Sequence, residues 1–240
     1  MELLNTVYRD WIRNFQWGHL VSLTNNKCIG YVIRNYKFKN YDFSMSDITN
    51  DNLKLLGNCH FVDLSWCSHL RSDAIKHLAK CRKLGLRNCR LLTDDTVKLL
   101  ANCSYLDLGW CLGLTDQSIK LLGRCHWLDL SCSNVSDQSL EYLAGCHSLE
   151  LFSCRRITDD GVQFLRNCHK LSLSGCYQIT DRSVKFLGQC YSLDLSYCRR
   201  ISDHSMKFLN KCSIVNLYCC AISPEATKLL TCCQKLYYQL

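Results

Sequence analysis

Proline is nearly absent from this sequence of 240 residues, which contains only Pro224. Long apolar runs are also absent. None approaches the ~20 residues that a membrane-spanning helix requires, so we expect no membrane segment. The chain lacks a glycine-rich phosphate loop, a nucleophile motif and a C-x-x-C cysteine pair. These absences argue against an enzyme, and we predict no catalytic residue and no cofactor.

A secretory signal is missing as well, because Arg9 and Asp10 follow Met1 and Glu2 before any long apolar core. The sequence is nevertheless rich in cysteine, with 20 residues. Without an export signal, abundant cysteine is expected to remain as free thiols in a reducing compartment. The sequence therefore predicts a cytoplasmic or nuclear protein.

One unit of 22 residues, which shortens twice to 21, makes up nearly all of the chain. Each unit opens with a cysteine, and these first-position cysteines are Cys59, Cys81, Cys103, Cys125, Cys146, Cys168, Cys190, Cys212 and Cys233. An apolar-x-apolar triplet follows, such as Leu106-Asp107-Leu108, whose period of two predicts a short strand with one buried face. No linker separates the units, so we expect one domain.

The second half of each unit carries the signals of a helix start. A threonine or serine such as Thr115 occupies the N-cap position, and an aspartate such as Asp116 follows it. The aspartate places negative charge at the positive end of the helix dipole. Pro224 takes the same position in the last unit, where proline is tolerated. The first full unit has Arg71 at the cap, so we expect Ser72 to act as the cap instead.

Strand, turn and helix in so short a unit predict a parallel sheet inside an arc, with helices outside. The unit resembles the leucine-rich repeat, whose pattern L-x-x-L-x-L-x-x-N/C appears here with cysteine in the first position. Leu106-Asp107-Leu108-Gly109-Trp110-Cys111 and Leu114-Thr115-Asp116 are similar to the cysteine-containing subclass in F-box/leucine-rich-repeat proteins. The spacing of the two cysteines is shorter than is usual there, and the Leu-Pro opening of an F-box is missing.

The resemblance implies an α/β leucine-rich-repeat solenoid with a curved parallel sheet inside and short helices outside. It covers residues 38–240, as one cap repeat, about eight repeats of 21–22 residues and a final strand expected over residues 236–240. Residues 1–37 do not fit the repeat. They contain an amphipathic pattern over residues 3–15 and a second apolar run, which Thr24 could cap, from Ile29 to Tyr36.

Two interpretations of residues 1–37 remain open. They form either a helical N-terminal cap that shields the first rung of the solenoid or a diverged F-box. The resemblance implies that such an F-box would dock a cullin adaptor of a ubiquitin ligase.

A second cysteine follows the triplet in most units, as Cys67, Cys111 and Cys132 do. The partial unit from Phe38 places Phe38 and Met45 at the two cysteine positions, with Tyr41 and Phe43 for the leucines. Phenylalanine and methionine replace cysteine as apolar filler but not as a metal ligand. We therefore interpret these cysteines as small buried apolar residues. The positions outside the two series, and hence the candidate reactive thiols, are Cys28, Cys220 and Cys232.

The unit that opens at Cys125 is one residue short, and we assign the loss to the turn between Leu130 and Cys132. Three consecutive units carry a histidine after the first cysteine, namely His126, His147 and His169. Parallel stacking would set them ~5 Å apart in a row, but rings in a row converge poorly on one Zn²⁺. We therefore predict no metal site.

A net charge of +8 comes partly from one lysine per helix, a set that we call the lysine lane: Lys54, Lys76, Lys98, Lys120, Lys185, Lys207 and Lys228. Repetition at one helical position indicates a solvated face. The alternative is that the lysine lane binds nucleic acid or another anionic surface. Aspartates on the inner face oppose phosphate there, so a nucleic-acid partner is disfavoured.

Residues that vary between the fixed leucines are the candidates for binding a protein partner on the concave face. They are Phe61, Asp63, Trp66, Tyr105, Asp107, Trp110, Trp127, Asp129, Glu150, Phe152, Arg155, Arg156, Asp194, Tyr197, Arg199 and Arg200. Exposed aromatic residues beside charges are typical of interface centres. The sequence therefore predicts a protein-interaction scaffold, and the resemblance implies substrate recognition for a cullin/F-box-type ubiquitin ligase.

Overall fold

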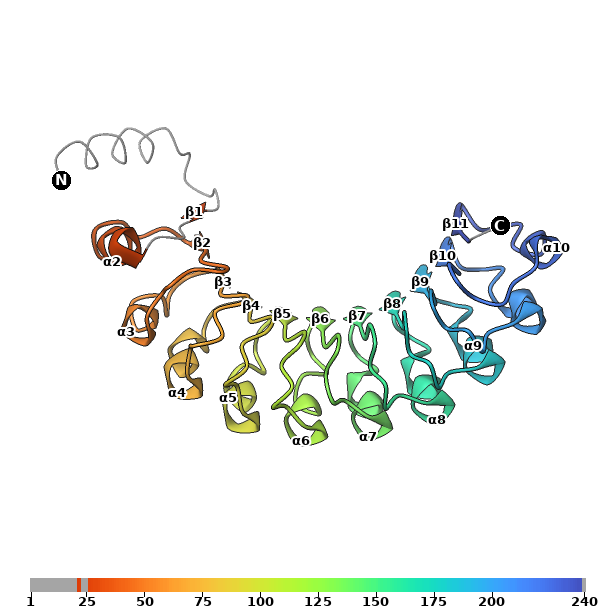
Figure 1. Ribbon diagram of the computed structural model, residues 1–240, viewed down its shortest axis with the longest axis horizontal. Coiled ribbons are helices and arrows are strands. Elements are labelled where there is room, and N and C mark those ends of the chain that lie inside the picture. The colour runs from red at the N-terminus through yellow and green to blue at the C-terminus, as the bar shows by residue number, and fades with distance from the viewer. Residues whose placement is uncertain (1–20, 23–25, 239–240) are drawn as a thin grey trace.

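The protein forms an arc in which each unit contributes one strand to the inner surface and one helical segment to the outer surface (Figure 1). The structure is a computed structural model, and it describes residues 21–22 and 26–238. It confirms the predicted α/β solenoid with a curved parallel sheet inside and short helices outside.

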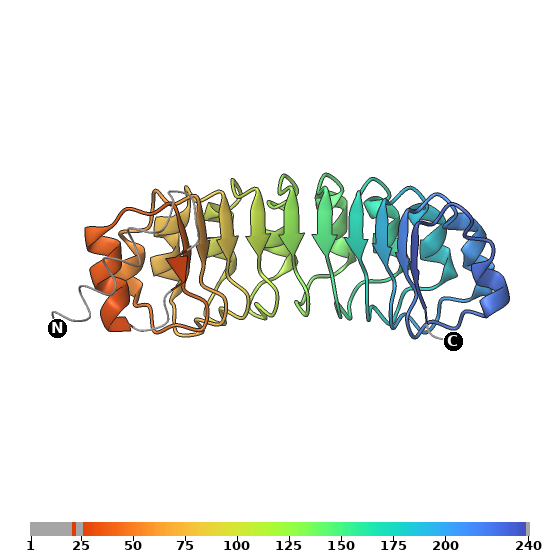
Figure 2. The same cartoon turned by 90° about the horizontal axis from the view of Figure 1, so that it is seen from above.

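Eleven strands of the described residues form one parallel sheet in sequence order, and Figure 2 shows them side by side. They are β1 (Val21–Ser22), β2 (Asn40–Asp42), β3 (Phe61–Asp63), β4 (Lys83–Gly85), β5 (Tyr105–Asp107), β6 (Trp127–Asp129), β7 (Ser148–Glu150), β8 (Lys170–Ser172), β9 (Ser192–Asp194), β10 (Ile214–Asn216) and β11 (Lys235–Tyr237). Equivalent residues pair, as Leu106 does with Leu128. The expected final strand thus begins at Lys235 rather than at Leu236 and ends at Tyr237, with residues 239–240 outside the description.

The helical segments are short and often finish as a 3₁₀ turn. The α-helices are α2 (Asn26–Asn35), α3 (Asn50–Leu53), α4 (Ser72–Ile75), α5 (Asp94–Leu99), α6 (Asp116–Ile119), α7 (Asp137–Leu140), α8 (Asp159–Val162), α9 (Asp181–Leu187) and α10 (Pro224–Thr227). The 3₁₀ segments are η1 (Lys76–Leu78), η2 (Glu141–Leu143), η3 (Gln163–Leu165) and η4 (Asp203–Phe208). No helix in the described ranges has both the length and the apolar character needed to cross a bilayer.

The core is one continuous apolar layer between the sheet and the helices. Leu106 points into this layer from β5, and Leu108 does so from the position just after the strand. Ile119 and Leu122 contact them from the helical side. All four side chains are fully buried. The period-two triplet and the helical spacing of each unit therefore face the same layer, which is why a unit this short folds only between neighbours.

From β2 to β10, the chain leaves each strand through a turn with one residue in the left-handed region. These residues are Met45, Trp66, Asn88, Trp110, Cys132, Ser153, Gly175, Tyr197 and Cys219, with φ between 55° and 69°. Where the strand ends in aspartate, the side chain stabilises this turn, as when Asp107 accepts a hydrogen bond from the backbone N–H of Gly109 at 2.9 Å. The recurring aspartate thus has a structural role that the sequence analysis did not identify.

Serine, not the residue before it, takes the second cysteine position in two units. Ser46 and Ser133 are buried, and the Oγ of Ser133 lies 3.8 Å from the Sγ of the following unit's Cys154. Met45 and Cys132 occupy the left-handed positions instead. The assignment of Met45 and Cys132 to the buried series was therefore wrong. In the unit that opens at Cys125, the missing residue falls after Ser133. The predicted loss between Leu130 and Cys132 was therefore wrong, and the turn after Leu130 keeps its length.

The last full unit shows the same one-residue shift. Cys220 was predicted to lie outside the cysteine series, but its thiol donates to the carbonyl of Leu195 at 3.0 Å. That bond repeats the one from Cys198 to Leu173 in the unit before. Cys219, at the left-handed position, is the cysteine outside the series.

The buried thiols contribute hydrogen bonds as well as volume. Cys103 donates to the carbonyl of Cys81 at 3.1 Å, and Cys125 donates to the carbonyl of Cys103 at 3.2 Å. Burial raises the pKa of Cys103 to about 11 and that of Cys125 to about 12. These thiols are therefore protonated near neutral pH, in a form that suits a small packed donor and not a nucleophile.

The aspartate at each helix start binds the next unit as well as facing its own helix dipole. Asp94 accepts hydrogen bonds from the backbone N–H of Thr115 at 2.9 Å, from its hydroxyl at 2.6 Å and from Ser118 at 2.6 Å. Partial burial alone would raise the pKa of Asp94, but the bonds from Ser118 and Thr115 outweigh it and hold that pKa below 3.8. A row of such bonds therefore links the convex ends of neighbouring units.

Most predicted caps accept the expected bond, as Thr115 does from the backbone N–H of Gln117. The prediction that Ser72 would replace Arg71 was wrong. Arg71 itself occupies the N-cap of α4 and accepts no side-chain hydrogen bond there. Ser72 serves the following unit instead, because its hydroxyl accepts a bond from the N–H of Thr93 at 3.0 Å.

At the N-terminal end, α2 covers the first rung of the solenoid. Ile29, Val32 and Ile33 of this helix are buried and join the core, while Tyr31 is exposed. β1 pairs with β2 and so extends the sheet by one strand that the repeat pattern did not predict. The helical pattern expected over residues 3–15 and the possible cap Thr24 lie outside the described residues.

Candidate partner-binding surface

The predicted binding residues fall into two sets. The floor set projects from the first and third residues of the strands onto the concave face: Phe61, Asp63, Tyr105, Asp107, Trp127, Asp129, Glu150 and Asp194. The loop rim set lies in the turns after the strands: Trp66, Trp110, Phe152, Arg155, Arg156, Tyr197, Arg199 and Arg200. Parallel pairing in constant register brings each set together along the arc.

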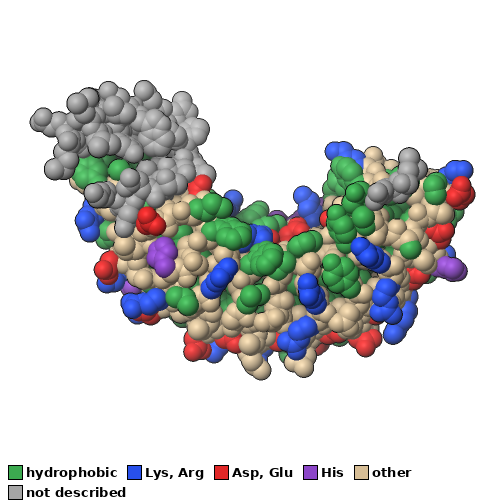
Figure 3. Space-filling view, viewed as in Figure 1, with side chains coloured by type: hydrophobic (Ala, Val, Ile, Leu, Met, Phe, Trp, Pro, Cys, Tyr) green, Lys and Arg blue, Asp and Glu red, His purple; other side chains and the backbone are tan. Residues whose placement is uncertain are grey.

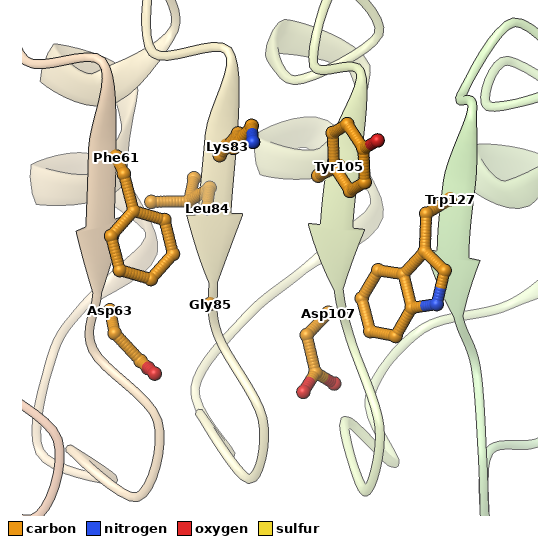
Figure 4. Close-up of a pocket in the computed structure, with 8 residues that line it drawn as sticks. All are labelled: Phe61, Asp63, Lys83, Leu84, Gly85, Tyr105, Asp107 and Trp127. Carbon is orange, nitrogen blue, oxygen red and sulfur yellow. The ribbon is translucent and has the colours of Figure 1, made fainter.

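A pocket of about 360 Å³ hollows the floor between β3 and β6. Figure 4 shows Phe61 on one side and Trp127 on the other, with Asp63 and Asp107 toward the ends of their strands. Gly85 opens this space because it lacks a side chain where its neighbours carry carboxylates. A Cβ at Gly85 would clash with the Asp63 carboxylate, which leans toward Gly85, and would displace it.

Lys83 lines the other end of the same pocket. Its ammonium lies 4.5 Å from the centroid of the Tyr105 ring, as in a cation–π contact. The sequence analysis did not select Lys83, because a charged residue at a strand start carries no signal of its own. Its place in the pocket follows only from the pairing of Phe61, Lys83 and Tyr105 across three strands.

Arg87 is the central charged residue that the sequence analysis missed. Its Nε donates to Asp107 Oδ2 at 3.0 Å, and its Nη2 donates to the carboxylate of Asp129. The guanidinium passes over Gly109, where any larger residue would meet it. Arg87 therefore neutralises two floor carboxylates from a turn that belongs to an earlier unit.

Arg87 does not offset all of the negative charge of the floor. Burial, with repulsion from Asp129 and Asp194, raises the pKa of Glu150 to about 7. Burial and the charge of Asp129 raise the pKa of Asp107 to about 6, although Arg87 acts in the opposite direction. The floor is thus acidic in a chain whose net charge is +8, and its charge changes close to neutral pH.

The loop rim alternates aromatic and basic side chains, and Figure 3 shows such groups along the concave margin of the face in view. Trp110 and Phe152 are 44% and 42% exposed. They flank a second hollow of about 550 Å³, where the shortened unit supplies Ser133 and Asn134. Arg156 donates to the carbonyl of Asn134 at 3.2 Å.

The three histidines stack face to face rather than pointing at one centre. Ring centroids of His126 and His147, and of His147 and His169, are 4.5 Å apart, and Tyr191 continues the row at 4.8 Å from His169. Desolvation and the two flanking histidines lower the pKa of His147 below 6.5. In the part of the chain that the structure describes, no group of three or more potential metal ligands converges.

The lysine lane lies exposed on the convex helices. Two of its members pair with acids on their own helix, Lys54 with Asp51 and Lys98 with Asp95, each at 2.8 Å. Acidic residues interrupt the positive charge of this face, as expected for a solvated surface.

Comparison with known proteins gives the same architecture. The family described as Leucine Rich repeat matches residues 147–165, and no curated protein matches the chain. Among solved structures, Rad7 in its yeast complex with Elc1 has a TM-score of 0.60 at 16% identity, over 87% of this chain and 71% of that one. An internalin C2 of Listeria monocytogenes has a TM-score of 0.59 at 19% identity, over 89% and 92%.

A third similar structure, TLR13 in complex with ssRNA13, has a TM-score of 0.62 at 19% identity. The alignment covers 92% of this chain but 38% of that one. At such identities the three likenesses concern the fold. Together with the family match over residues 147–165 and the repeated strand, turn and helix, they show that the chain has the leucine-rich-repeat solenoid fold.

Proposed function

We propose that this chain is a protein-interaction scaffold that binds a partner protein on its concave face. The observation that carries the proposal is the pocket at Gly85, which interrupts an otherwise regular floor and is walled by Phe61, Tyr105 and Trp127. Large aromatic side chains around a hollow are the usual anchors of binding energy. The convex helical segments carry the lysine lane together with exposed apolar side chains such as Leu99, Tyr142 and Phe164.

The loop rim extends this surface beyond the floor. Trp66, Trp110 and Tyr197 are each more than two-fifths exposed, and each sits at a left-handed position that directs it away from the core. A backbone conformation held by the strand-end carboxylates keeps these side chains in place before a partner arrives. Such preorganisation reduces the entropy lost on binding.

The chemistry of the floor favours protein over nucleic acid. TLR13, similar in fold, was solved with single-stranded RNA, but the floor here presents Asp63, Asp129, Glu150 and Asp194. These carboxylates repel phosphate, and a nucleic-acid ligand would need clustered cations instead. The interrupted lysine lane does not supply such a cluster.

The test compares two double variants in affinity capture from the native host. We expect Tyr105→Ala with Trp127→Ala to weaken binding of the captured partner by roughly 2 kcal/mol or more, without unfolding the protein. Lys98→Ala with Lys120→Ala on the convex face should leave binding unchanged. Loss of binding in the lysine pair and none in the aromatic pair would place the site on the outer surface. Melting temperatures of both variants provide the control for folding.

We further propose that the chain recognises substrates for a cullin/F-box-type ubiquitin ligase, with residues 1–37 contacting the adaptor. The F-box/leucine-rich-repeat resemblance supports this role, and Rad7, similar in fold, was solved with a second protein, Elc1. α2 is anchored to the first rung by Ile29, Val32 and Ile33, so an adaptor held there would be rigidly linked to the concave face.

A pull-down with a cullin adaptor tests the role of the N-terminal segment. The full chain should bind, whereas a chain that lacks residues 1–20, or one with Tyr31→Ala on the exposed side of α2, should bind less. Deleting all of residues 1–37 would expose the first rung, so these smaller changes are preferable. Undiminished binding by both would remove the N-terminal segment from the interface.

A further inference from the structure

The pocket at Gly85 combines aromatic walls with a carboxylate that has no cation of its own. Asp63 Oδ1 accepts a hydrogen bond from the N–H of Ser65 at 2.8 Å, which closes the turn after β3. Among the residues that the structure describes, Asp63 forms no ion pair, whereas Asp107 pairs with Arg87. One side of the pocket therefore ends in an uncompensated negative charge, half-buried beside an apolar wall.

The pocket leaves room for a flat group between Phe61 and Trp127, beside the Asp63 carboxylate that leans over Gly85. Asp63, Gly85 and Asp107 are paired in register, so the two carboxylates stand two strand spacings apart, ~10 Å between backbones. Phe61 and Trp127 enclose the space from opposite sides in Figure 4. A planar cation fits there with one face on an aromatic ring and one edge toward Asp63.

Lys83 already shows that the pocket wall accepts a cation. Its ammonium rests over Tyr105, at the end of the pocket away from the carboxylates. A second cation would thus find an aromatic surface and the Asp63 carboxylate at the opposite end, but would feel repulsion from Lys83. The contributions of Asp63 and Lys83 to cation binding therefore have opposite signs.

We propose that this pocket takes an arginine side chain from an extended segment of the partner protein. The inference rests on the proposed function and names the chemistry of the anchor. The guanidinium lies between Phe61 and Trp127, stacks against Phe61 and donates to the Asp63 carboxylate, which leans over Gly85. Arginine fits better than lysine because its planar head both stacks on aromatic faces and donates along one edge to a carboxylate.

The acidic floor beyond the pocket favours the same partner. Asp129 on β6, Glu150 on β7 and Asp194 on β9 continue the negative charge along the floor, and Arg87 pairs with the first of them. A basic segment lying along the arc would meet Glu150 and Asp194 after the pocket. An acidic segment would be repelled from every one of them, so complementarity selects the basic partner.

The test uses a blocked tripeptide, acetyl-Gly-Arg-Gly-amide, against the full chain. Its matched control is the citrulline tripeptide, which keeps the shape and loses the charge. Binding is followed by NMR through the indole N–H of Trp127, assigned by its disappearance in Trp127→Phe. We expect a saturable shift with the arginine peptide and an affinity at least about fivefold weaker with the citrulline peptide.

Two variants should move the affinity in opposite directions. Asp63→Asn should weaken the arginine peptide about fivefold, to the level of citrulline, and Lys83→Met should strengthen it about twofold. Asp73→Asn on the convex face and Lys170→Met, at the strand position of Lys83 in β8, are the controls and should change nothing. Far-UV circular dichroism of each variant reports whether it is folded.

Three results would overturn the proposal: equal affinity for the arginine and citrulline peptides, no effect of Asp63→Asn, or no binding up to about 20 mM peptide. Tighter binding of a glutamate tripeptide would overturn it as well. After any of these results, the proposed binding site on the concave face would still hold if the variant Tyr105→Ala with Trp127→Ala no longer binds the captured partner. If the arginine peptide binds the pocket but the double variant keeps its partner, the pocket accepts arginine but the partner does not use it, and the concave binding site is refuted.

Discussion

Replacing Arg87 with methionine tests the charge arrangement of the floor. Arg87 is the cation between Asp107 and Asp129, and the side chains are 27%, 18% and 7% exposed. Methionine keeps the aliphatic part of the Arg87 side chain, removes the guanidinium that lies over Gly109, and leaves two carboxylates on adjacent strands without their cation. Breaking a buried pair this way costs about 3 to 5 kcal/mol. Because the guanidinium is partly exposed, we expect about 2 to 3 kcal/mol near pH 7.5.

The cost should depend on pH in a defined direction. Burial already raises the pKa of Asp107 to about 6, above 3.8 in the unfolded chain, and removing Arg87 raises it further. A carboxyl whose folded pKa is raised loses stability as pH rises from its unfolded pKa through its folded pKa. The penalty of Arg87→Met should therefore shrink to about 1 kcal/mol near pH 5, where protonation relieves the repulsion.

Urea unfolding followed by far-UV circular dichroism at both pH values measures these differences. Adding Asp129→Asn to Arg87→Met should recover at least half of the loss near pH 7.5, because one of the facing charges is gone. Arg90→Met serves as the matched control, since Arg90 is exposed and donates to Asn88. An equal loss at both pH values, or no recovery in the double variant, would refute the assignment of Arg87 as the neutralising residue.

Three further predictions concern stability. Cys103→Ala should cost about 1 kcal/mol in thermal melts, whereas Cys103→Asp buries an unpaired charge and should unfold neighbouring units. Asp159→Ala should cost about 2 kcal/mol near pH 7 because Thr180 and Ser183 lose their shared acceptor. That cost should fade as pH drops through the lowered pKa of Asp159. Glu150→Gln should stabilise the protein by about 1 kcal/mol near pH 8 and not near pH 5, since the raised pKa of Glu150 makes its ionised form unfavourable.

Each of these has a clear contrary outcome. Equal stability of the two Cys103 variants would mean that this side chain does not face the core. A pH-independent effect of Asp159→Ala would exclude the ionised carboxylate as the acceptor. Destabilisation by Glu150→Gln near pH 8 would show that Glu150 has a cation partner.

The fold could be predicted from the periodicity of the sequence. The pattern within one unit determines which strand leucines are buried, and all the other units repeat that pattern. The triplet Leu106-Asp107-Leu108 already shows which side chains enter the core, and the structure buries both leucines. The position of the second cysteine was less well determined. Ser133 and Cys132 are adjacent and similar in size, and only the left-handed turn after Leu130 decides which of them faces inward.

The candidate site was predictable only in part. Its aromatic residues Tyr105 and Trp127 stand at a variable position inside a fixed frame, so the sequence alone selects them. Arg87 and Lys83 act through neighbouring strands, and their contacts depend on the direction of long side chains across units. Asp94 was interpreted as a partner of its own helix dipole, although its bonds to Thr115 cross to the next unit.

Site-specific photocrosslinking tests most directly whether the concave face is the binding surface. The crosslinking residue p-benzoylphenylalanine replaces Tyr105 on the floor, Phe152 on the loop rim or Lys98 on the convex helices, one position at a time. In host extract, we predict a crosslink to the same partner protein from Tyr105 and from Phe152, and none from Lys98. A partner crosslinked from Lys98 but from neither concave position would contradict the account.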